Sequence, residues 1–274
     1  MTDFRPSVAL IGAGAMGGAM LRGWLEAGAI DVDGSALFDP APPQEIADLA
    51  DARGLAVNPA SGAQSLCVDV LVCAVKPQAA ADALPAYAAL AADAVVVSVM
   101  AGKSVARISA LLGGAPRIVR AMPNLPASVG RGVSGLYAGE AVTASQRDVV
   151  ERLMRAAGGT VWVDSEAAID AVTAISGSGP AYFFLMVEAL SEAGEALGLP
   201  RDAAETLARA AAAGAGALLD ADRRSAAQMR EAVTSPGGTT AAALKVLDAG
   251  DAPLRRLMKE ATAAAARRAG ELTE

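Results

Sequence analysis

The sequence contains no histidine among its 274 residues. Histidine is the side chain whose charge normally changes near neutral pH, and it supplies the base of common catalytic triads and the usual ligand of zinc. Its absence excludes histidine-based triads and the common zinc sites. Any reaction of this chain must therefore make little demand on proton transfer.

Cysteine is nearly as rare, because Cys67 and Cys73 are the only two. They lie in or beside an apolar segment and lack the spacing of a CxxC pair. Simple burial is therefore a better interpretation than a disulfide or a metal site, and we predict no metal ligands in this chain.

Long apolar runs and basic clusters are missing as well. No run of 18 or more purely apolar residues occurs, which argues against a membrane span. The net charge is −7, from 23 basic and 30 acidic residues, and no basic block would bind a phosphate backbone. Residues 1–6 lack the charged-then-apolar pattern of a signal peptide. We therefore expect a cytoplasmic protein that binds neither nucleic acid nor a membrane.

Apolar residues, by contrast, make up 53% of the chain. The first half alternates between apolar strands and helices, and only helical periodicity remains after about residue 167. This pattern predicts an α/β Rossmann-type parallel sheet in residues 1–164 and an all-α domain in residues 165–274. The expected strands are 7–11, 36–38, 68–74, 94–99, 117–122, 133–138 and 160–163, and the expected helices between them are 16–27, 43–53, 78–90, 105–112 and 144–157.

Two helical segments of the second domain, 203–219 and 253–270, are rich in alanine and other apolar residues. They are too hydrophobic to face water alone, so a second copy of the chain is expected to cover them. The sequence predicts a homodimer, and it leaves open whether dimers assemble into larger rings.

A glycine-rich turn follows the first expected strand, in the sequence Gly12-Ala-Gly-Ala-Met-Gly17. In a strand–turn–helix unit the first glycine permits the tight turn, the second lets the backbone approach a pyrophosphate, and the third allows close packing. The N-terminus of the next helix favours an anion. A glycine turn without a ligand is the alternative, but this context favours a bound dinucleotide.

Asp39 ends the second expected strand, 22 residues after Gly17. An acid at this place normally accepts hydrogen bonds from the ribose hydroxyls, which favours NAD. Residues 40–44 supply no Arg or Lys for the 2′-phosphate of NADP. A solvated turn acid is the alternative interpretation.

Three further segments follow strand ends, at residues 74–78, 100–102 and 120–126. Ligands of open α/β sheets bind beyond the carboxyl ends of the strands, so each segment is expected to face the nicotinamide half of the cofactor. Lys76 is either a functional cation or a solvated charge, and the backbone of residues 74–77 is the alternative contact.

Two turns rich in small and hydroxyl residues precede expected helices in the second domain. They are Ser176-Gly-Ser-Gly-Pro180, before a helix over 181–197, and Thr234-Ser-Pro-Gly-Gly-Thr-Thr240. Free N–H groups and hydroxyls at such helix starts would bind a small carboxylate, and helix capping alone is the alternative for either turn.

The chain resembles the pyrroline-5-carboxylate reductase family over essentially its whole length. The segments that carry the resemblance are Ile11-Gly-Ala-Gly-Ala-Met-Gly17, Ala74-Val-Lys-Pro-Gln78, Arg120-Ala-Met-Pro-Asn124, Ser176-Gly-Ser-Gly-Pro-Ala-Tyr182 and Glu231-Ala-Val-Thr-Ser-Pro-Gly-Gly-Thr-Thr240. The last two segments, in this order and spacing, are quite specific to the family.

The resemblance implies a Rossmann domain, a helical domain interleaved with a partner subunit, and a substrate site completed across the dimer. It also implies NADPH or NADH as cofactor and pyrroline-5-carboxylate as substrate, with Thr240 facing the substrate and Lys76 steadying cofactor or substrate charge. Expected cofactor contacts are Ile11, Gly12, Ala13, Gly14, Ala15, Met16, Gly17, Asp39, Ala74, Val75, Lys76, Pro77, Met100 and Ala101, and expected substrate contacts are Met122, Pro123, Asn124, Ser176, Ser178, Gly179, Ser235, Gly237, Gly238, Thr239 and Thr240.

Three positions depart from the family pattern. Leu125 stands where threonine is usual, Asp39 replaces the more neutral or basic residues of NADPH users, and residues 222–225 lack the usual His-Pro. The second departure favours NADH, whereas the family usually favours NADPH.

Two other interpretations compete with a reductase. The β-hydroxyacid dehydrogenases share the glycine-rich turn, but they need a catalytic lysine on a helix, and residues 181–197 contain no lysine. A dinucleotide-binding scaffold or sensor without turnover is supported only by Leu125 and residues 222–225. Reduction of a cyclic imine suits a chain without histidine best, because the imine nitrogen can already carry its proton.

Overall fold

The computed structural model describes residues 4–60 and 62–273. The chain forms two compact units, one from Met1–Ser178 with Ala265–Glu274 and one from Gly179–Ala264. The domain boundary expected after residue 164 stays a prediction. Each unit is described below by itself.

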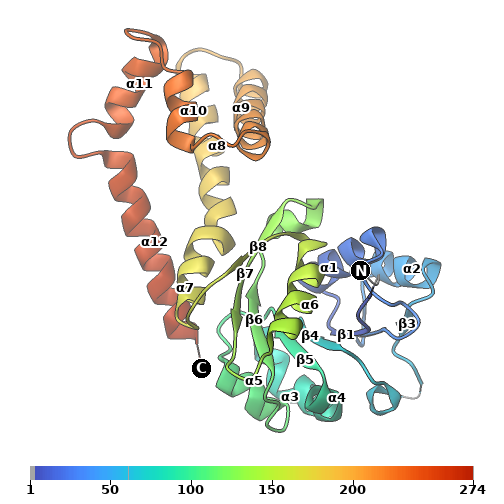
Figure 1. Cartoon of the computed structure of the whole chain (residues 1–274). Helices are drawn as coiled ribbons and strands as arrows, with labels where there is room; N and C mark the ends of the chain where they lie inside the picture. Colours follow the sequence, from blue (N-terminus) through green and yellow to red (C-terminus); the bar gives the residue numbers. More distant parts are fainter. Residues whose placement is uncertain (1–3, 61, 274) are drawn as a thin grey trace. The chain divides into compact units, whose positions relative to one another are not determined.

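The described part of the first unit contains one eight-stranded sheet, in the order β3-β2-β1-β4-β5-β6-β7-β8 (Figure 1). Neighbouring strands are parallel except for β6 and β7. The strand order turns back between β1 and β4, which is where ligands bind in such sheets. The strands are β1 (Val8–Ile11), β2 (Ala36–Phe38), β3 (Ala56–Val57), β4 (Val70–Cys73), β5 (Val95–Ser98), β6 (Ile118–Met122), β7 (Gly132–Ala138) and β8 (Gly158–Trp162).

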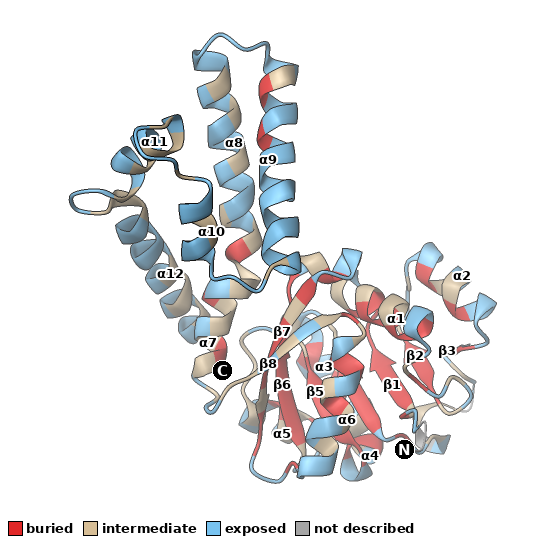
Figure 2. Ribbon diagram, turned by 45° about the horizontal axis from the view of Figure 1, so that its top comes forward, coloured by how far each residue is buried: buried red, intermediate tan, exposed pale blue. Residues whose placement is uncertain are grey.

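Apolar side chains cover both faces of this sheet, as parallel strands require. Helices α1, α2 and α6 bury a cluster on one face that contains Trp24 and Leu153, while α3 to α5 bury a cluster on the other face that contains Ile108. Figure 2 shows the resulting buried layer in red. Trp24 Nε1 donates to the Leu153 carbonyl at 3.0 Å and so fixes α1 against α6. The helices are α1 (Ala15–Ala27), α2 (Gln44–Ala52), α3 (Ala80–Ala83), α4 (Ala88–Asp93), α5 (Val105–Leu111) and α6 (Ala144–Arg155).

One local expectation was wrong. The helix expected over residues 78–90 is broken into α3, α4 and short 3-10 turns, because Pro85 lacks an N–H and clashes with the carbonyl four residues back. The strand expected over residues 133–138 is present as β7, and it runs antiparallel to its neighbour β6. The connection over residues 123–131 is too short for the crossover that a parallel pair needs.

After β8 the chain is helical, as expected. The second unit pairs α8 with α9, and a Cβ on Gly194 would lie only 2.9 Å from Ala204 Cβ, so small residues let these helices approach closely. No helix in the described part of the chain is long and apolar enough to cross a membrane. The helices are α7 (Ala168–Val172), α8 (Gly179–Ala196), α9 (Arg201–Ala221), α10 (Ala226–Ala232), α11 (Thr239–Asp248) and α12 (Pro253–Leu272).

Candidate active site

The glycine-rich turn joins the end of β1 to α1 in the form that the sequence predicts. Gly12 has φ +93°, a region that favours glycine, and a Cβ there would lie 2.8 Å from the Ala74 carbonyl oxygen. A Cβ on Gly17 would lie 2.1 Å from the Gly12 carbonyl oxygen, so the helix packs on the turn only because Gly17 has no side chain. A Cβ on Gly14 would meet no described atom within 4 Å. The space over the middle of the turn is therefore open.

The first turn of α1 presents backbone amides at this turn. The N-cap is Gly14, which has no side chain to cap the helix, and Gly18 N–H donates back to its carbonyl at 2.8 Å. The preceding amides, those of Ala15, Met16 and Gly17, have no carbonyl one turn back to pair with. Free amides and the positive end of the helix dipole favour an anion. These residues fit the pyrophosphate of a dinucleotide.

Asp39 follows β2, and both oxygens of its carboxylate accept hydrogen bonds from backbone amides. Its Oδ2 accepts the Ala13 N–H at 2.6 Å and its Oδ1 accepts the Ala41 N–H at 2.9 Å. Asn58 brackets the Asp39 backbone, since Asn58 Oδ1 accepts the Asp39 N–H at 3.0 Å and Asn58 Nδ2 donates to the Asp39 carbonyl at 2.6 Å. Asp39 thus ties the glycine-rich turn to β2. Each carboxylate oxygen has a second lone pair that can accept a hydrogen bond from a ribose hydroxyl.

The segment after β4 lies next to the glycine-rich turn. The Ala74 N–H donates to the Ile11 carbonyl at 2.8 Å, so residues 74–77 leave the sheet beside Gly12. Val75 and Pro77 are half-buried, whereas Lys76 is exposed, and no described group pairs with its ammonium. The backbone of this segment is adjacent to the open turn, and the role of the Lys76 side chain stays a prediction.

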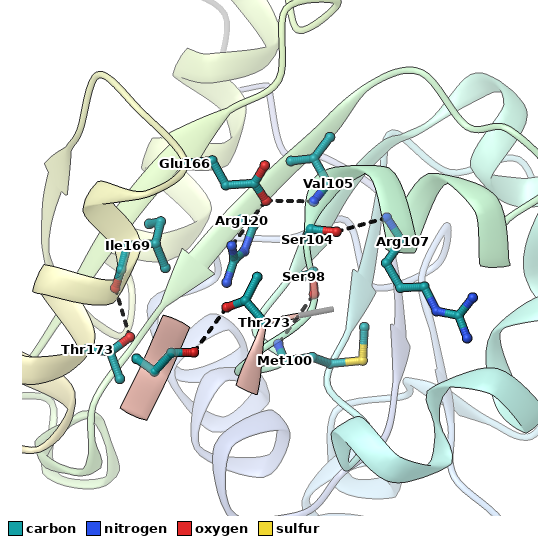
Figure 3. Close-up of polar contacts among 11 residues, drawn as sticks. Ser98, Met100, Ser104, Val105, Arg107, Arg120, Glu166, Ile169, Thr173 and Thr273 are labelled. Atoms are coloured by element: carbon teal, nitrogen blue, oxygen red, sulfur yellow. Dashed lines mark hydrogen bonds and ion pairs between the residues drawn. The ribbon is translucent and has the colours of Figure 1, made fainter. Parts of the chain in front are cut away.

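The turn after β5 exposes some of its predicted contacts and buries others. Met100 is only 3% exposed, and its N–H donates to the Ser98 hydroxyl at 3.3 Å (Figure 3). Ala101 is exposed, and Gly102, with φ +68°, packs against the Leu272 carbonyl, from which a Cβ would be 2.5 Å away. Contact with a cofactor through the Met100 side chain is therefore unfavourable, which leaves the backbone and Ala101.

Asn124 is 8% exposed, and both ends of its amide are engaged. Its Oδ1 accepts the Val133 N–H at 2.9 Å and its Nδ2 donates to the Ser176 carbonyl at 3.1 Å. In a helix the Ser176 carbonyl would accept the N–H of the residue four positions later. That residue is Pro180, which has no N–H, so the carbonyl can accept from Asn124. The structure thus brings Met122, Pro123 and Asn124 close to the Ser176 turn, since a Cβ on Gly177 would lie 4.0 Å from Met122 Cγ.

The expected helix is present as α8, which starts at Gly179, but the Ser176–Pro180 segment continues an earlier helical run and does not open a free helix end. A π-helical turn over Thr173–Gly177 joins α7 to α8, and Ser178 keeps helical backbone angles. The Ser176 hydroxyl donates to the Val172 carbonyl at 3.0 Å, and the Ser178 N–H donates to the Thr173 carbonyl at 2.8 Å. Because the helix is continuous here, the amides expected to bind a carboxylate already donate hydrogen bonds within the helix. Gly179 is buried, and the proposed substrate contacts at this segment stay untested.

The second predicted turn does begin a helix, in the second unit. Gly237 has φ +72°, Gly238 is the N-cap of α11, and no side chain caps this end. The Ala242 N–H donates to the Gly238 carbonyl, which leaves the amides of Thr239, Thr240 and Ala241 without a partner one turn back. Ser235 and Thr239 are exposed and Thr240 is half-buried. This end of α11 can accept a carboxylate.

Three participants were missed by sequence reasoning. Asn58, which clamps Asp39, and Glu166, which pairs with Arg120 at 3.0 Å, act across long sequence separations that no local motif marks. Tyr87 packs edge-on against Phe38 at 5.3 Å, beside Asp39. Burial raises the pKa of Tyr87, and the Asp39 charge raises that pKa further, so the phenol is a hydrogen-bond donor at neutral pH.

Comparison with known proteins matches a different family model to each half of the chain and one family of relatives to nearly the whole chain. The model for pyrroline-5-carboxylate reductase dimerisation matches residues 166–272, and a model described as NADP oxidoreductase, coenzyme F420-dependent, matches residues 7–102. The pyrroline-5-carboxylate reductase of Pseudomonas aeruginosa is 40% identical over 270 residues, which covers 98% of this chain and 97% of the relative.

Solved structures agree with the sequence match. A pyrroline-5-carboxylate reductase from Coxiella burnetii superposes with a TM-score of 0.88 at 37% identity, covering 99% of this chain and 100% of that chain. The Plasmodium falciparum pyrroline carboxylate reductase with NADP bound gives a TM-score of 0.79 at 25% identity, covering 98% of each chain. Because sequence and fold agree over nearly the whole length, this chain belongs to the pyrroline-5-carboxylate reductase family.

Proposed function

We propose that this chain reduces 1-pyrroline-5-carboxylate to L-proline with NADH or NADPH. The observation that carries the proposal is the open glycine-rich turn, locked to β2 by Asp39, in a chain of this family. The bound nucleotide supplies a hydride to the imine carbon. The imine nitrogen can already carry its proton when it binds, so the reaction needs no histidine.

The residues of the chain bind and orient the reactants. We assign the diphosphate to the amides of residues 15–17, and the substrate carboxylate to the N-terminus of α11. Thr240 is proposed to hydrogen-bond the ring nitrogen, and Lys76 to steady charge on cofactor or substrate. Holding both reactants in a fixed geometry accounts for most of the acceleration expected of such a site.

Within this function we propose that NADH is preferred. The Asp39 carboxylate lies where the adenosine ribose would hydrogen-bond, and its two oxygens are fixed by Ala13 and Ala41. A 2′-phosphate beside this charge would be repelled, and residues 40–44 provide no cation to offset the repulsion. The Plasmodium falciparum relative was solved with NADP bound, so a chain of this family can also bind the phosphorylated nucleotide.

The assembly proposed is a homodimer, with rings of dimers as a further possibility to be measured. Large apolar side chains on α8 are well exposed in the isolated chain, including Phe183 at 69% and Leu185 at 63%. We also place the protein in the cytoplasm. Cys67 is exposed and Cys73 is buried, and both are free thiols, as is usual in a reducing compartment.

The first test is oxidation of NADH and of NADPH, followed by absorbance after pyrroline-5-carboxylate is added last to the purified protein. Imine-dependent oxidation of either nucleotide is the expected result, faster with NADH. Binding of both nucleotides without oxidation would reject the reductase and leave the scaffold or sensor. Reduction of NAD or NADP by a 3-hydroxy acid would instead support a β-hydroxyacid dehydrogenase.

A further inference from the structure

The turn after β5, residues 99–104, is anchored at both ends by side chains of the first unit (Figure 3). At its start the Met100 N–H donates to Ser98. At its end Ser104 caps α5 by accepting the Arg107 N–H at 3.1 Å, and the Val105 N–H donates to Glu166 at 2.7 Å. The position of this turn therefore depends on a carboxylate 61 residues further along the chain.

One oxygen of Glu166 serves two donors. Glu166 Oε1 accepts both the Val105 N–H and Nη1 of Arg120, the latter at 3.0 Å. The Arg120 side chain is only 3% exposed, and that of Glu166 is 32% exposed. A cation buried to this degree needs a charge partner, so Arg120 holds the Glu166 carboxylate in place. Arg120 itself is fixed by β6, where it pairs with Ser98 of β5 and Tyr137 of β7.

We propose that Glu166 is a positioning residue for the nicotinamide end of the cofactor site. Its carboxylate, oriented by Arg120, fixes the first amide of α5 and with it residues 99–104. This inference rests on the proposed function, because it takes the carboxyl end of β5 as the place where the nicotinamide half lies. In the described part of the chain Glu166 accepts from Val105 and Arg120 and not from residues 11–17, so binding of the adenosine diphosphate half should not depend on it.

The test compares Glu166→Gln with a matched control, Glu151→Gln. Glu151 also pairs with an arginine, Arg155, and its side chain has a similar exposure of 27%, but it lies on α6 and contacts Thr160 and Trp162. For both variants we would measure kcat, the KM for NADH, the deuterium isotope effect on kcat with NADD, and the affinity for ADP-ribose, which lacks nicotinamide.

Glu166→Gln is expected to lower kcat about tenfold or more, since small displacements of reacting atoms have such effects. The isotope effect on kcat should rise, because hydride transfer becomes slower than product release, while the affinity for ADP-ribose stays within about twofold. Glu151→Gln should leave kcat, the isotope effect on kcat and the affinity for ADP-ribose unchanged. An unchanged kcat in folded Glu166→Gln would overturn the proposal, as would a parallel loss of kcat and ADP-ribose affinity.

A second variant removes the donor and leaves the ion pair. Val105→Pro deletes the N–H that Glu166 accepts, and proline is well tolerated at the first position of a helix. Ser104 already has the extended backbone, with ψ 159°, that a residue before proline requires. The same loss of kcat is expected, and full activity of this variant would contradict the proposal even if Glu166→Gln did not fold.

Failure of the proposed function can be told apart from failure of this inference. If the unmodified protein oxidises neither nucleotide, the reductase is rejected. The fluorescence of bound NADH then tests the positioning role of Glu166. Weaker NADH binding by Glu166→Gln than by the unmodified protein, with ADP-ribose binding retained, supports the role. NADH binding equal to that of the unmodified protein overturns it.

Discussion

Asp39 has a structural role in the chain, and the proposed function gives its charge a selective role as well. Its carboxylate ties Ala13 of the glycine-rich turn to the end of β2, and the same charge stands at the place where a nucleotide ribose would bind. The geometry of the carboxylate is fixed by backbone amides, so it cannot turn away from a 2′-phosphate without losing those bonds.

Replacing Asp39 by asparagine should shift the cofactor preference toward NADPH. Removing the charge is expected to raise the ratio of kcat/KM for NADPH to that for NADH about tenfold, which corresponds to about 1.4 kcal/mol of repulsion. Steady-state kinetics with both nucleotides measure this ratio. Asp33→Asn changes net charge equally but lies before β2, at its opposite end, so the ratio should not change in that control.

At the scale of elements, the start of α11 is an uncapped helix N-terminus with two threonines. Thr240→Val keeps the size of the side chain and removes its hydroxyl, and it is expected to lower kcat/KM for the imine about tenfold if that hydroxyl hydrogen-bonds the substrate. Thr262→Val, on α12, where the hydroxyl donates to the Met258 carbonyl of its own helix, is the matched control. Equal kinetics of both variants would remove Thr240 from the site.

Helix α6 and strand β8 are joined through Glu151, which accepts hydrogen bonds from Arg155 and from Trp162 Nε1 at 3.0 Å. The hydrogen bond from Arg155 is the main cause that lowers the pKa of Glu151, and the bond from Trp162 is the next. A lowered pKa in the folded state stabilises the protein above the unfolded pKa, and this contribution disappears as the pH falls through the folded pKa.

Glu151→Gln should therefore lower the midpoint of thermal unfolding at pH 7 more than at pH 3. Unfolding followed by circular dichroism at the two pH values measures the difference. An equal loss at both would mean that the charge of Glu151 contributes nothing to stability.

At the scale of the whole molecule, the apolar surface of α8 requires cover. Phe184 is 62% exposed in the isolated chain, as are neighbours on the same helix to similar degrees. A second copy is the occupant that the dimerisation-domain match favours.

Phe184→Ser is accordingly expected to weaken the dimer. Light scattering should give twice the chain mass of 27.3 kDa for the unmodified protein and a smaller mass for the variant at low concentration. Phe4→Ser, at a residue 49% exposed in the other unit, should leave the mass unchanged. A monomeric unmodified protein would exclude a site shared by two subunits.

The accuracy of the sequence-based expectations depended on the range of the interactions involved. The family, the fold class and the glycine-rich turn were predicted correctly, because they depend on neighbouring residues and on periodic burial. The expectation that a free helix start lies at Ser176–Pro180 was not met, while the substrate contacts proposed there stay a prediction. Serine and glycine before a helical segment indicate a helix start. In the structure the chain is already helical over Thr173–Gly177, and the distant Asn124 donates to the Ser176 carbonyl within that helical turn.

By itself, the sequence determined where strands alternate with helices, where the chain turns on Gly12 and Gly17, and that no histidine takes part. These properties follow from local sterics and from the apolar pattern. Only the tertiary structure decided which distant groups meet, such as Asn58 with Asp39 and Glu166 with Arg120. Pairing a carboxylate with a buried guanidinium depends on how the sheet and its connections fold in space, and no spacing in the sequence encodes that distance.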